Sequence, residues 1–148
     1  MVTVEPGLTV HLPDEAATHA FAQGLAAVLR TGDVVAMTGD LGAGKTTLAR
    51  ALIRQLAGEP ELEVPSPTYT LTQTYETAPK VTHFDLYRLA DDSELDELGF
   101  EEAAETGIVL VEWPERARQV LEEASLTIAL RIAPDGGRDA TLSPTPEL

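Results

Sequence analysis

The feature that most constrains this chain is a glycine-rich run, GDLGAGKTT, at residues 39–47. It fits the phosphate-loop pattern of Gly, four residues, then Gly-Lys-Ser/Thr. The preceding DVVAMT at 33–38 has the composition of a buried strand, and apolar residues recur at helical spacing after the loop until Gly58. The glycines therefore fall where a strand ends and a helix begins, and there the backbone N–H groups and the helix dipole together attract phosphate. We predict a nucleoside triphosphate site here.

Two side chains in this run have predicted roles of their own. Lys45 is placed to reach the terminal phosphates, and the hydroxyl of Thr46 is placed to ligate magnesium. The remaining residues are expected to line the nucleotide: Gly39, Asp40, Leu41, Gly42, Ala43, Gly44 and Thr47. A glycine-rich turn that merely reverses the chain is the alternative. The coincidence of strand, spacing, Lys-Thr pair and helix argues against it.

Two carboxylates follow predicted strands elsewhere in the chain. Asp85 lies in the predicted strand 81–86, and Glu112 follows the apolar run IVLV at 108–111. Phosphoryl transfer needs a magnesium ion held partly by carboxylate and a group that positions the nucleophile. Ligands of open α/β sheets collect beyond the carboxyl ends of the strands. From the residues alone Asp85 is the better metal candidate and Glu112 is the other. We expect both residues to be catalytic and to ligate metal, without deciding which one holds it directly and which one orients water. A solvated charge at a strand end is the alternative for each.

Three further residues have weaker signals. Thr68 lies in a Ser-Pro-Thr loop that is placed to fold over a γ-phosphate, although such loops are also common turn chemistry. Trp113, the only tryptophan, follows Glu112 and either contacts nucleotide or a partner or forms a half-buried core ring. His83 is expected to be a packed or surface residue.

The chain has no asparagine, so it lacks the Asn-Lys-x-Asp element with which many GTPases recognise guanine. This absence favours ATP over GTP as the nucleotide.

The order of predicted elements indicates an α/β fold. We expect a P-loop NTPase-like three-layer sandwich with a mixed central sheet, parallel where 34–38 and 108–111 take part. Residues 1–143 are expected to form one domain and 144–148 a frayed tail. The other predicted elements are a strand at 8–12, a helix capped by Asp14 over about 15–30, paired strands at 70–75 and 81–86, helical turns in 91–105 broken near Gly99, a helix from Pro114 to about 123, and a hairpin of 126–132 with 139–142.

Composition narrows the classes of partner. The chain is 43% hydrophobic and 24% charged, has no cysteine, and contains no apolar run near the ~20 residues that a membrane span needs. It also lacks a secretory signal pattern at its start. We therefore expect a cytoplasmic protein with no membrane partner. Twenty-five Asp and Glu against ten Lys and Arg give a formal charge of −15, which disfavours a large direct contact with nucleic-acid phosphates.

Taken together, these motifs resemble the TsaE family, the small bacterial ATPases needed for threonylcarbamoyladenosine modification of tRNA. HFDLYR followed by VEWPE is more selective than the phosphate loop, which many families share. The similarity spans roughly residues 12–116 and is weak past about 117. The matching pieces are LPDEAAT at 12–18, GDLGAGKTTLAR at 39–50, SPTYTL at 66–71, HFDLYRLAD at 83–91, ELDELGFEE at 94–102 and LVEWPER at 110–116.

The resemblance implies an accessory protein that binds and slowly hydrolyses Mg-ATP and is not itself the transferase. It would act between turnovers on the complex that modifies the adenosine beside the anticodon in ANN-decoding tRNAs. Its partners would be TsaD and TsaB-like subunits, with tRNA contacted mainly through them. The resemblance also assigns roles to residues: Thr46 and Glu112 to magnesium, Asp85 to the nucleotide–metal site, Thr68 and Trp113 near the nucleotide, and Glu15 on its base side.

Two other function classes fit the same loop. One is a small P-loop kinase acting on a nucleoside or another metabolite, although the region after Asp85 is rich in carboxylates where such kinases usually carry lid arginines. The other is a non-hydrolysing, nucleotide-gated binding module whose acidic block at 91–105 docks a basic partner surface. The sequence leaves the oligomeric state open.

Overall fold

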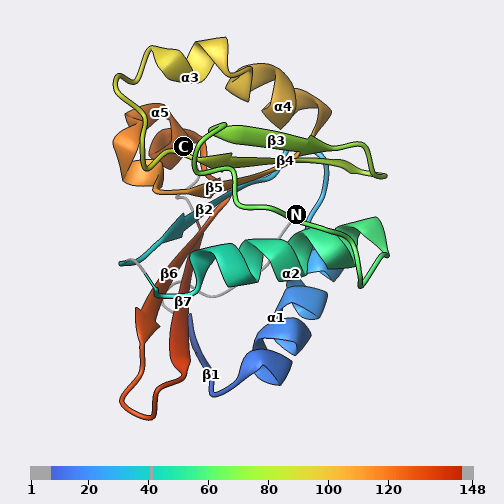
Figure 1. The fold of residues 1–148 in the computed structure, drawn as a ribbon, viewed down its shortest axis with the longest axis vertical. Coiled ribbons are helices and arrows are strands. Elements are labelled where there is room, and N and C mark those ends of the chain that lie inside the picture. Colours follow the sequence, from blue (N-terminus) through green and yellow to red (C-terminus); the bar gives the residue numbers. More distant parts are fainter. Residues whose placement is uncertain (1–7, 41, 145–148) are drawn as a thin grey trace.

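A computed structural model describes residues 8–40 and 42–144 as one mixed sheet with helices on both faces (Figure 1). The sheet has seven strands in the order β1-β7-β6-β2-β5-β4-β3. The strands are β1 Leu8–Leu12, β2 Val34–Thr38, β3 Thr72–Tyr75, β4 Lys80–Asp85, β5 Gly107–Glu112, β6 Leu126–Ile132 and β7 Arg138–Pro144. The helices are α1 Glu15–Val28, α2 Lys45–Ala57, α3 Glu94–Glu97, α4 Phe100–Thr106 and α5 Arg118–Glu123, with a 3₁₀ turn η1 at Pro114–Arg116.

The centre of the sheet is parallel and its two sides are antiparallel. β2 pairs in parallel with both β5 and β6, and β4 pairs in parallel with β5. β3 is added antiparallel to β4, while β7 and then β1 are added antiparallel beyond β6. The predicted mixed α/β sheet is confirmed, including the parallel pairing of 34–38 with 108–111.

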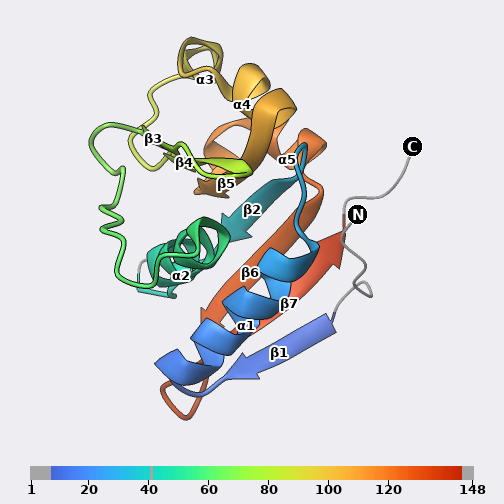
Figure 2. The same cartoon turned by 90° about the vertical axis from the view of Figure 1, so that its right-hand side faces the viewer.

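Alternation along the central strands divides the core into two layers. Val35 and Met37 of β2 pack in the cluster that includes α1 and α2, whereas Val34 and Ala36 pack in the cluster that includes α3, α4 and α5. Figure 2 shows α1 and α2 along one face of the sheet and α3, α4 and α5 toward the other. Both faces of β2 are covered, in keeping with the apolar run at 34–37 that makes up the strand up to Thr38.

Local capping residues set three of the helix boundaries. The Asp14 side chain accepts a hydrogen bond of 2.9 Å from the backbone N–H of Ala17, as expected of an N-cap. Gly58 ends α2, and Gly99 separates α3 from α4; both adopt positive φ, a conformation that favours glycine. α1 ends at Val28 and not near residue 30, because Leu29 is already extended.

Two predicted boundaries in the last third of the chain were wrong. The helix expected from Pro114 to about 123 is divided into η1 and α5, because buried Ala117 adopts an extended conformation between them. β7 runs from Arg138 to Pro144, beyond the predicted strand at 139–142, and Pro144 pairs with Leu126. Residues 145–148, the rest of the predicted frayed tail, lie outside the described residues.

The topology brings several loops to one edge of the sheet. β2, β4, β5 and β6 are parallel, so their carboxyl ends point the same way. The loop at 39–44 follows β2, Asp85 ends β4, Glu112 ends β5, and the turn at 133–137 joins β6 to β7. Within the described residues, no helix has the length and apolar character that crossing a membrane requires.

Candidate nucleotide-binding site

The loop between β2 and α2 has the backbone conformation that its glycines predict. Gly39, Gly42 and Gly44 all have positive φ, and Gly44 is the N-cap of α2. At Gly39, where φ is 142°, a Cβ atom would lie 2.5 Å from the backbone oxygen of Leu130 on β6. The loop therefore needs glycine there for both conformation and space. Leu41 lies outside the described residues.

Lys45 begins α2 and is buried, with 5% of its surface exposed. Its Nζ donates a hydrogen bond to the backbone oxygen of Gly39 and lies 3.4 Å from the centroid of the Trp113 ring. Burial lowers the pKa of Lys45, and the negative charge of Glu112 acts in the opposite direction. The ammonium group is thus held at the loop by a carbonyl and an aromatic face, contacts that an anionic ligand can replace.

A chain of hydrogen bonds joins α2, β5 and β4. Thr46 Oγ1 donates to Glu112 Oε1 at 2.7 Å, and the other carboxylate oxygen, Oε2, lies 2.7 Å from His83 Nε2. Glu112 is 2% exposed and His83 is 0% exposed. His83 is therefore packed, which is one of the two alternatives predicted for it. Its hydrogen bond to Glu112 was not predicted from the sequence.

Asp85 is the second buried carboxylate at this edge. Its Oδ2 accepts a hydrogen bond of 3.1 Å from Thr68 Oγ1, and its Oδ1 accepts one of 3.0 Å from the backbone N–H of Tyr87. Ser66 Oγ lies 2.7 Å from Thr68 Oγ1. The Ser-Pro-Thr loop is thereby tied to the carboxyl end of β4, beside the phosphate loop.

Trp113 follows Glu112 in the left-handed region, with φ of 58°. Such a conformation is uncommon for a bulky residue, and strained backbone of this kind clusters at functional sites. The ring is half-buried and its centroid lies 4.9 Å from that of Tyr87. The strained turn places the indole over Lys45.

Arg138 is a site residue that sequence reasoning missed. Its Nη2 donates to the backbone oxygen of Gly42 at 2.9 Å, and its Nη1 donates to the backbone oxygens of Gly136 at 2.8 Å and Gly137 at 3.0 Å. Arg138 belongs to no sequence motif, since it lies beyond residues 12–116, which contain the motifs that resemble the family. Only the pairing of β7 with β6 brings it to the loop.

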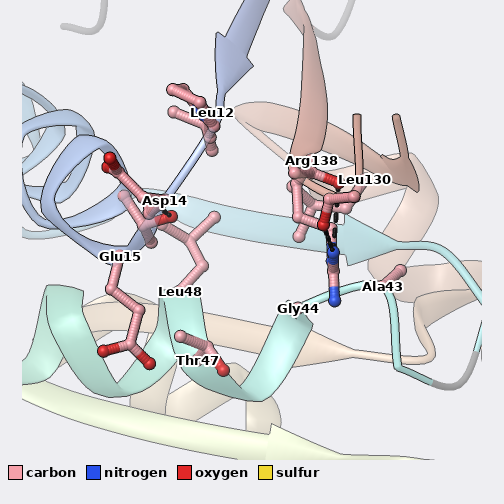
Figure 3. A pocket seen from close by; sticks show the side chains of 13 residues that line it. Leu12, Asp14, Glu15, Ala43, Gly44, Thr47, Leu48, Leu130 and Arg138 are labelled. Atoms are coloured by element: carbon pink, nitrogen blue, oxygen red, sulfur yellow. Dashed lines mark hydrogen bonds between the residues drawn. The ribbon is translucent and has the colours of Figure 1, made fainter. Parts of the chain in front are cut away.

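Two cavities open on either side of the loop and share Gly44, Thr47 and Arg138. The first, of about 220 Å³, is drawn in Figure 3, with Asp14 and Glu15 of the α1 start on one side and Arg138 with Gly44 on the other. The second, of about 320 Å³, is lined by Asp40, Gly42, Lys45, Thr46, Thr68, Asp85, Tyr87, Glu112 and Trp113 as well.

The predicted residues divide between these cavities in a consistent way. All three proposed metal ligands and Lys45 face the second cavity, whereas Glu15 and Ala43 line the first. Gly39 lines neither cavity and contributes through its hydrogen bond from Lys45. One cavity is therefore lined by the ammonium, hydroxyl and carboxylate groups, and the adjoining one shares Gly44, Thr47 and Arg138 with it.

An open sheet with a parallel centre, in which a glycine loop joins one strand to a helix beginning Lys-Thr, defines a P-loop fold. The family model described as "Threonylcarbamoyl adenosine biosynthesis protein TsaE" matches residues 12–140. The chain belongs to the TsaE family. The match continues past residue 117, where the recognised motifs end, and it includes Arg138.

Named relatives and a solved structure agree with this assignment. The tRNA threonylcarbamoyladenosine biosynthesis protein TsaE of Rickettsia felis is 39% identical over 86% of this chain and 74% of its own length. The TsaE protein of Haemophilus influenzae is 40% identical over 82% of this chain and 80% of its own length. The crystal structure of YdiB from Bacillus subtilis superposes with a TM-score of 0.75 at 27% identity, covering 98% of this chain and 90% of that one.

Proposed function

We propose that this protein binds and slowly hydrolyses Mg-ATP as an accessory to the threonylcarbamoylation of tRNA. The observation that supports this most directly is the hydrogen bond between Thr46 and Glu112, beside the buried ammonium of Lys45, in a cavity at the phosphate loop. Hydroxyl, carboxylate and ammonium groups at one point are what a magnesium–triphosphate complex requires.

The two adjoining cavities suit the parts of a nucleotide. The triphosphate would occupy the second cavity, along the N–H groups of the loop and the start of α2. The nucleoside would extend past Gly44 and Thr47 into the first cavity, where Glu15 lies on the proposed base side. Arg138 lines both cavities and would add a positive charge between them. ATP is favoured over GTP because the chain has no asparagine with which to form the common guanine-recognition element.

The residues present fit a magnesium ion. Mg²⁺ prefers oxygen ligands and usually takes one or two carboxylates together with waters and substrate phosphates. Thr46 Oγ1 and Glu112 Oε1 are such oxygens, already 2.7 Å apart, and Asp85 supplies a further carboxylate to the same cavity. Thr46, Glu112 and Asp85 would hold the ion, which would offset charge on the phosphates when bound. Within the described residues, no cluster of three or more His, Asp or Glu side chains suggests a tighter all-protein metal cage.

The remaining groups would position the reaction. Lys45 would exchange its contact with Gly39 for the terminal phosphates, drawing the γ-phosphoryl group to the loop. Of Asp85 and Glu112, one would hold the metal directly, and the other would hold it through water and orient the attacking water. Thr68 is hydrogen-bonded to Asp85 and would contact the γ-phosphate, as switch threonines do. The conformation of the 66–71 loop would then depend on whether the γ-phosphate is present.

The family name supports the biological part of the proposal, since the relatives are named for tRNA threonylcarbamoyladenosine biosynthesis. We propose that nucleotide-dependent switching in this protein resets the transferase, formed by TsaD and TsaB-like subunits, between turnovers. The formal charge of −15 supports contact with proteins more than extensive direct contact with tRNA.

The proposal is tested by comparing Lys45→Ala with Lys80→Ala. Lys80 is the only other lysine of the chain. It is not among the described residues that line either cavity. Each variant and the wild type are assayed for ATP hydrolysis alone, and with transferase subunits and tRNA for modified adenosine per transferase. Wild type and Lys80→Ala should support many rounds and Lys45→Ala about one. Equal yield from all three proteins would overturn the proposal.

The same assay separates the two other function classes. A small acceptor that accelerates ADP formation, with modification indifferent to this protein, would establish a kinase. Nucleotide binding without turnover in the presence of all partners, unchanged by Glu112→Gln, would establish a nucleotide-gated binding module.

A further inference from the structure

We propose that His83 is a positioning residue that fixes the Glu112 carboxylate for the nucleotide-bound magnesium. This inference rests on the proposed function, since it gives Glu112 its metal-binding role. Its basis is the hydrogen bond between His83 Nε2 and Glu112 Oε2, 2.7 Å long and fully inside the protein.

The sheet register explains why the two side chains meet. His83 of β4 is paired with Leu110 of β5, two residues before Glu112, and Asp85 is paired with Glu112 itself. Side chains two apart on a strand share a face, so His83 and Asp85 lie on the same side of β4. One strand thus supplies both a carboxylate to the cavity and the group that holds the neighbouring carboxylate.

Hydrogen-bond chemistry fixes the direction of this contact. An ionised carboxylate only accepts, so the proton must be on Nε2 of His83. Glu112 Oε1 accepts from Thr46, which means that each carboxylate oxygen has a donor from a different element. With Oε2 held by the imidazole, Oε1 is kept toward Thr46 and the proposed metal position. Partners of this kind orient metal ligands in many proteins.

The surroundings of His83 argue against a purely structural role. In the described part of the chain its Nδ1 is buried without a hydrogen-bond partner, so the only side chain it bonds is Glu112. Burying an imidazole with one unsatisfied nitrogen costs free energy that an apolar side chain of similar size would not. Packing alone would therefore be better served by leucine, and the histidine is explained by what it does to Glu112.

The test measures magnesium dependence, not turnover. Isothermal titration calorimetry with a non-hydrolysable ATP analogue gives nucleotide affinity over a series of magnesium concentrations. His83→Leu should raise the magnesium concentration for half-maximal effect by about 10–100-fold and leave the magnesium-free affinity unchanged. His83→Gln retains an amide donor that can reach Glu112 and should stay within about threefold of wild type. Thr82→Val, at the buried neighbouring position of β4, is the matched control and should behave as wild type.

Two further variants keep the proposal falsifiable if His83→Leu fails to fold, which thermal melting would show. His83→Asn has the chemistry of His83→Gln but a shorter reach, so it should need more magnesium than the glutamine variant. In a Glu112→Gln background, His83→Gln and His83→Asn should no longer differ.

The outcomes separate the role of His83 from the proposed function. Equal magnesium dependence for wild type and folded His83→Leu, or for the Gln and Asn variants, would overturn the role of His83 and leave the proposed function standing. If the nucleotide affinity of the wild type does not depend on magnesium concentration, both the metal site and the role of His83 are overturned.

Discussion

Arg138 Nη2 donates a hydrogen bond of 2.9 Å to the backbone oxygen of Gly42, although the two residues are 96 positions apart in the chain. The bond joins the β6–β7 hairpin to the phosphate loop. All the side-chain hydrogen bonds that Arg138 makes within the described residues go to carbonyl oxygens, those of Gly42, Gly136 and Gly137. No described carboxylate forms an ion pair with it, so its positive charge is available to an anion bound at the loop.

Arg138→Ala should weaken nucleotide binding by about tenfold or more, because hydrogen bonds to charged groups contribute about 1.5–3 kcal/mol. Arg138→Lys should recover only part of this loss, since an ammonium cannot reproduce the guanidinium fork. Arg131→Ala is the control, because Arg131 is an exposed arginine of the same hairpin that lies 3.7 Å from Asp139. Calorimetric titration with ATP measures all four proteins. An equal loss for the two alanine variants would show that hairpin stability, and not the contact to the loop, is responsible.

Gly39→Ala should lower the free energy of unfolding by about 1–3 kcal/mol, because alanine is strained at a φ of 142° and its Cβ would press on the backbone of β6. The paired variant Gly24→Ala should raise it by about 0.5–1 kcal/mol, since Gly24 lies inside α1 with open space around it. Urea unfolding followed by circular dichroism gives both values. The prediction fails if the two substitutions shift stability in the same direction.

Replacing Thr68 by valine should reduce ATP turnover and lower the free energy of unfolding by about 1 kcal/mol, because buried Asp85 loses one of its two donors. Thr68→Ser keeps the hydroxyl and should retain both properties. Thr70→Val changes an exposed threonine of the same loop and serves as the control. Steady-state hydrolysis and thermal melting are the measurements. If Thr68→Ser has no higher turnover or stability than Thr68→Val, the methyl group of Thr68, and not its hydrogen bond, is required.

Stability should depend on pH through His11. This residue lies 2.8 Å from Asp139 and 2.7 Å from Asp135, and these hydrogen bonds, the one to Asp139 first, raise the pKa of His11 above its ordinary value. A raised pKa in the folded state means that the contribution to stability is fully present below about pH 6.5 and is lost as the pH rises through the raised value.

We therefore expect the stability difference between wild type and His11→Gln to be largest near pH 6 and to shrink toward pH 8.5 in urea titrations. His19→Gln is the control, because the His19 ring forms a hydrogen bond with Gln55 and, among the described residues, no ion pair with a carboxylate. A difference that stays constant across this range would show that His11 acts by packing alone. Asp135 acts at the acidic end of the pH range. Hydrogen bonds from Gly137 and His11 lower the pKa of its carboxyl, so the contribution of the Asp135 carboxylate to stability is lost only as the solution becomes strongly acidic.

The sequence by itself determined the elements whose causes are local. The strand–loop–helix unit follows from apolar spacing and glycine positions within residues 33–58, and the strand at 108–111 follows from a run of apolar residues. Gly99 and Asp14 mark helix boundaries by chemistry that acts over three or four residues. These predictions were confirmed because a cap, a turn or a buried strand needs little from the rest of the chain.

The tertiary structure decided which side chains meet. His83 is bonded to Glu112 because β4 lies beside β5, and Arg138 reaches Gly42 because β7 returns beside β6; neither pairing leaves a signal in local sequence. The break at Ala117, which is buried and extended, likewise has no signal in the residue spacing around Pro114. Contacts between residues distant in the chain depend on strand order and register. For this reason the sequence located the phosphate loop and the carboxylates Asp85 and Glu112, and only the fold added His83 and Arg138 to the residues that surround the loop.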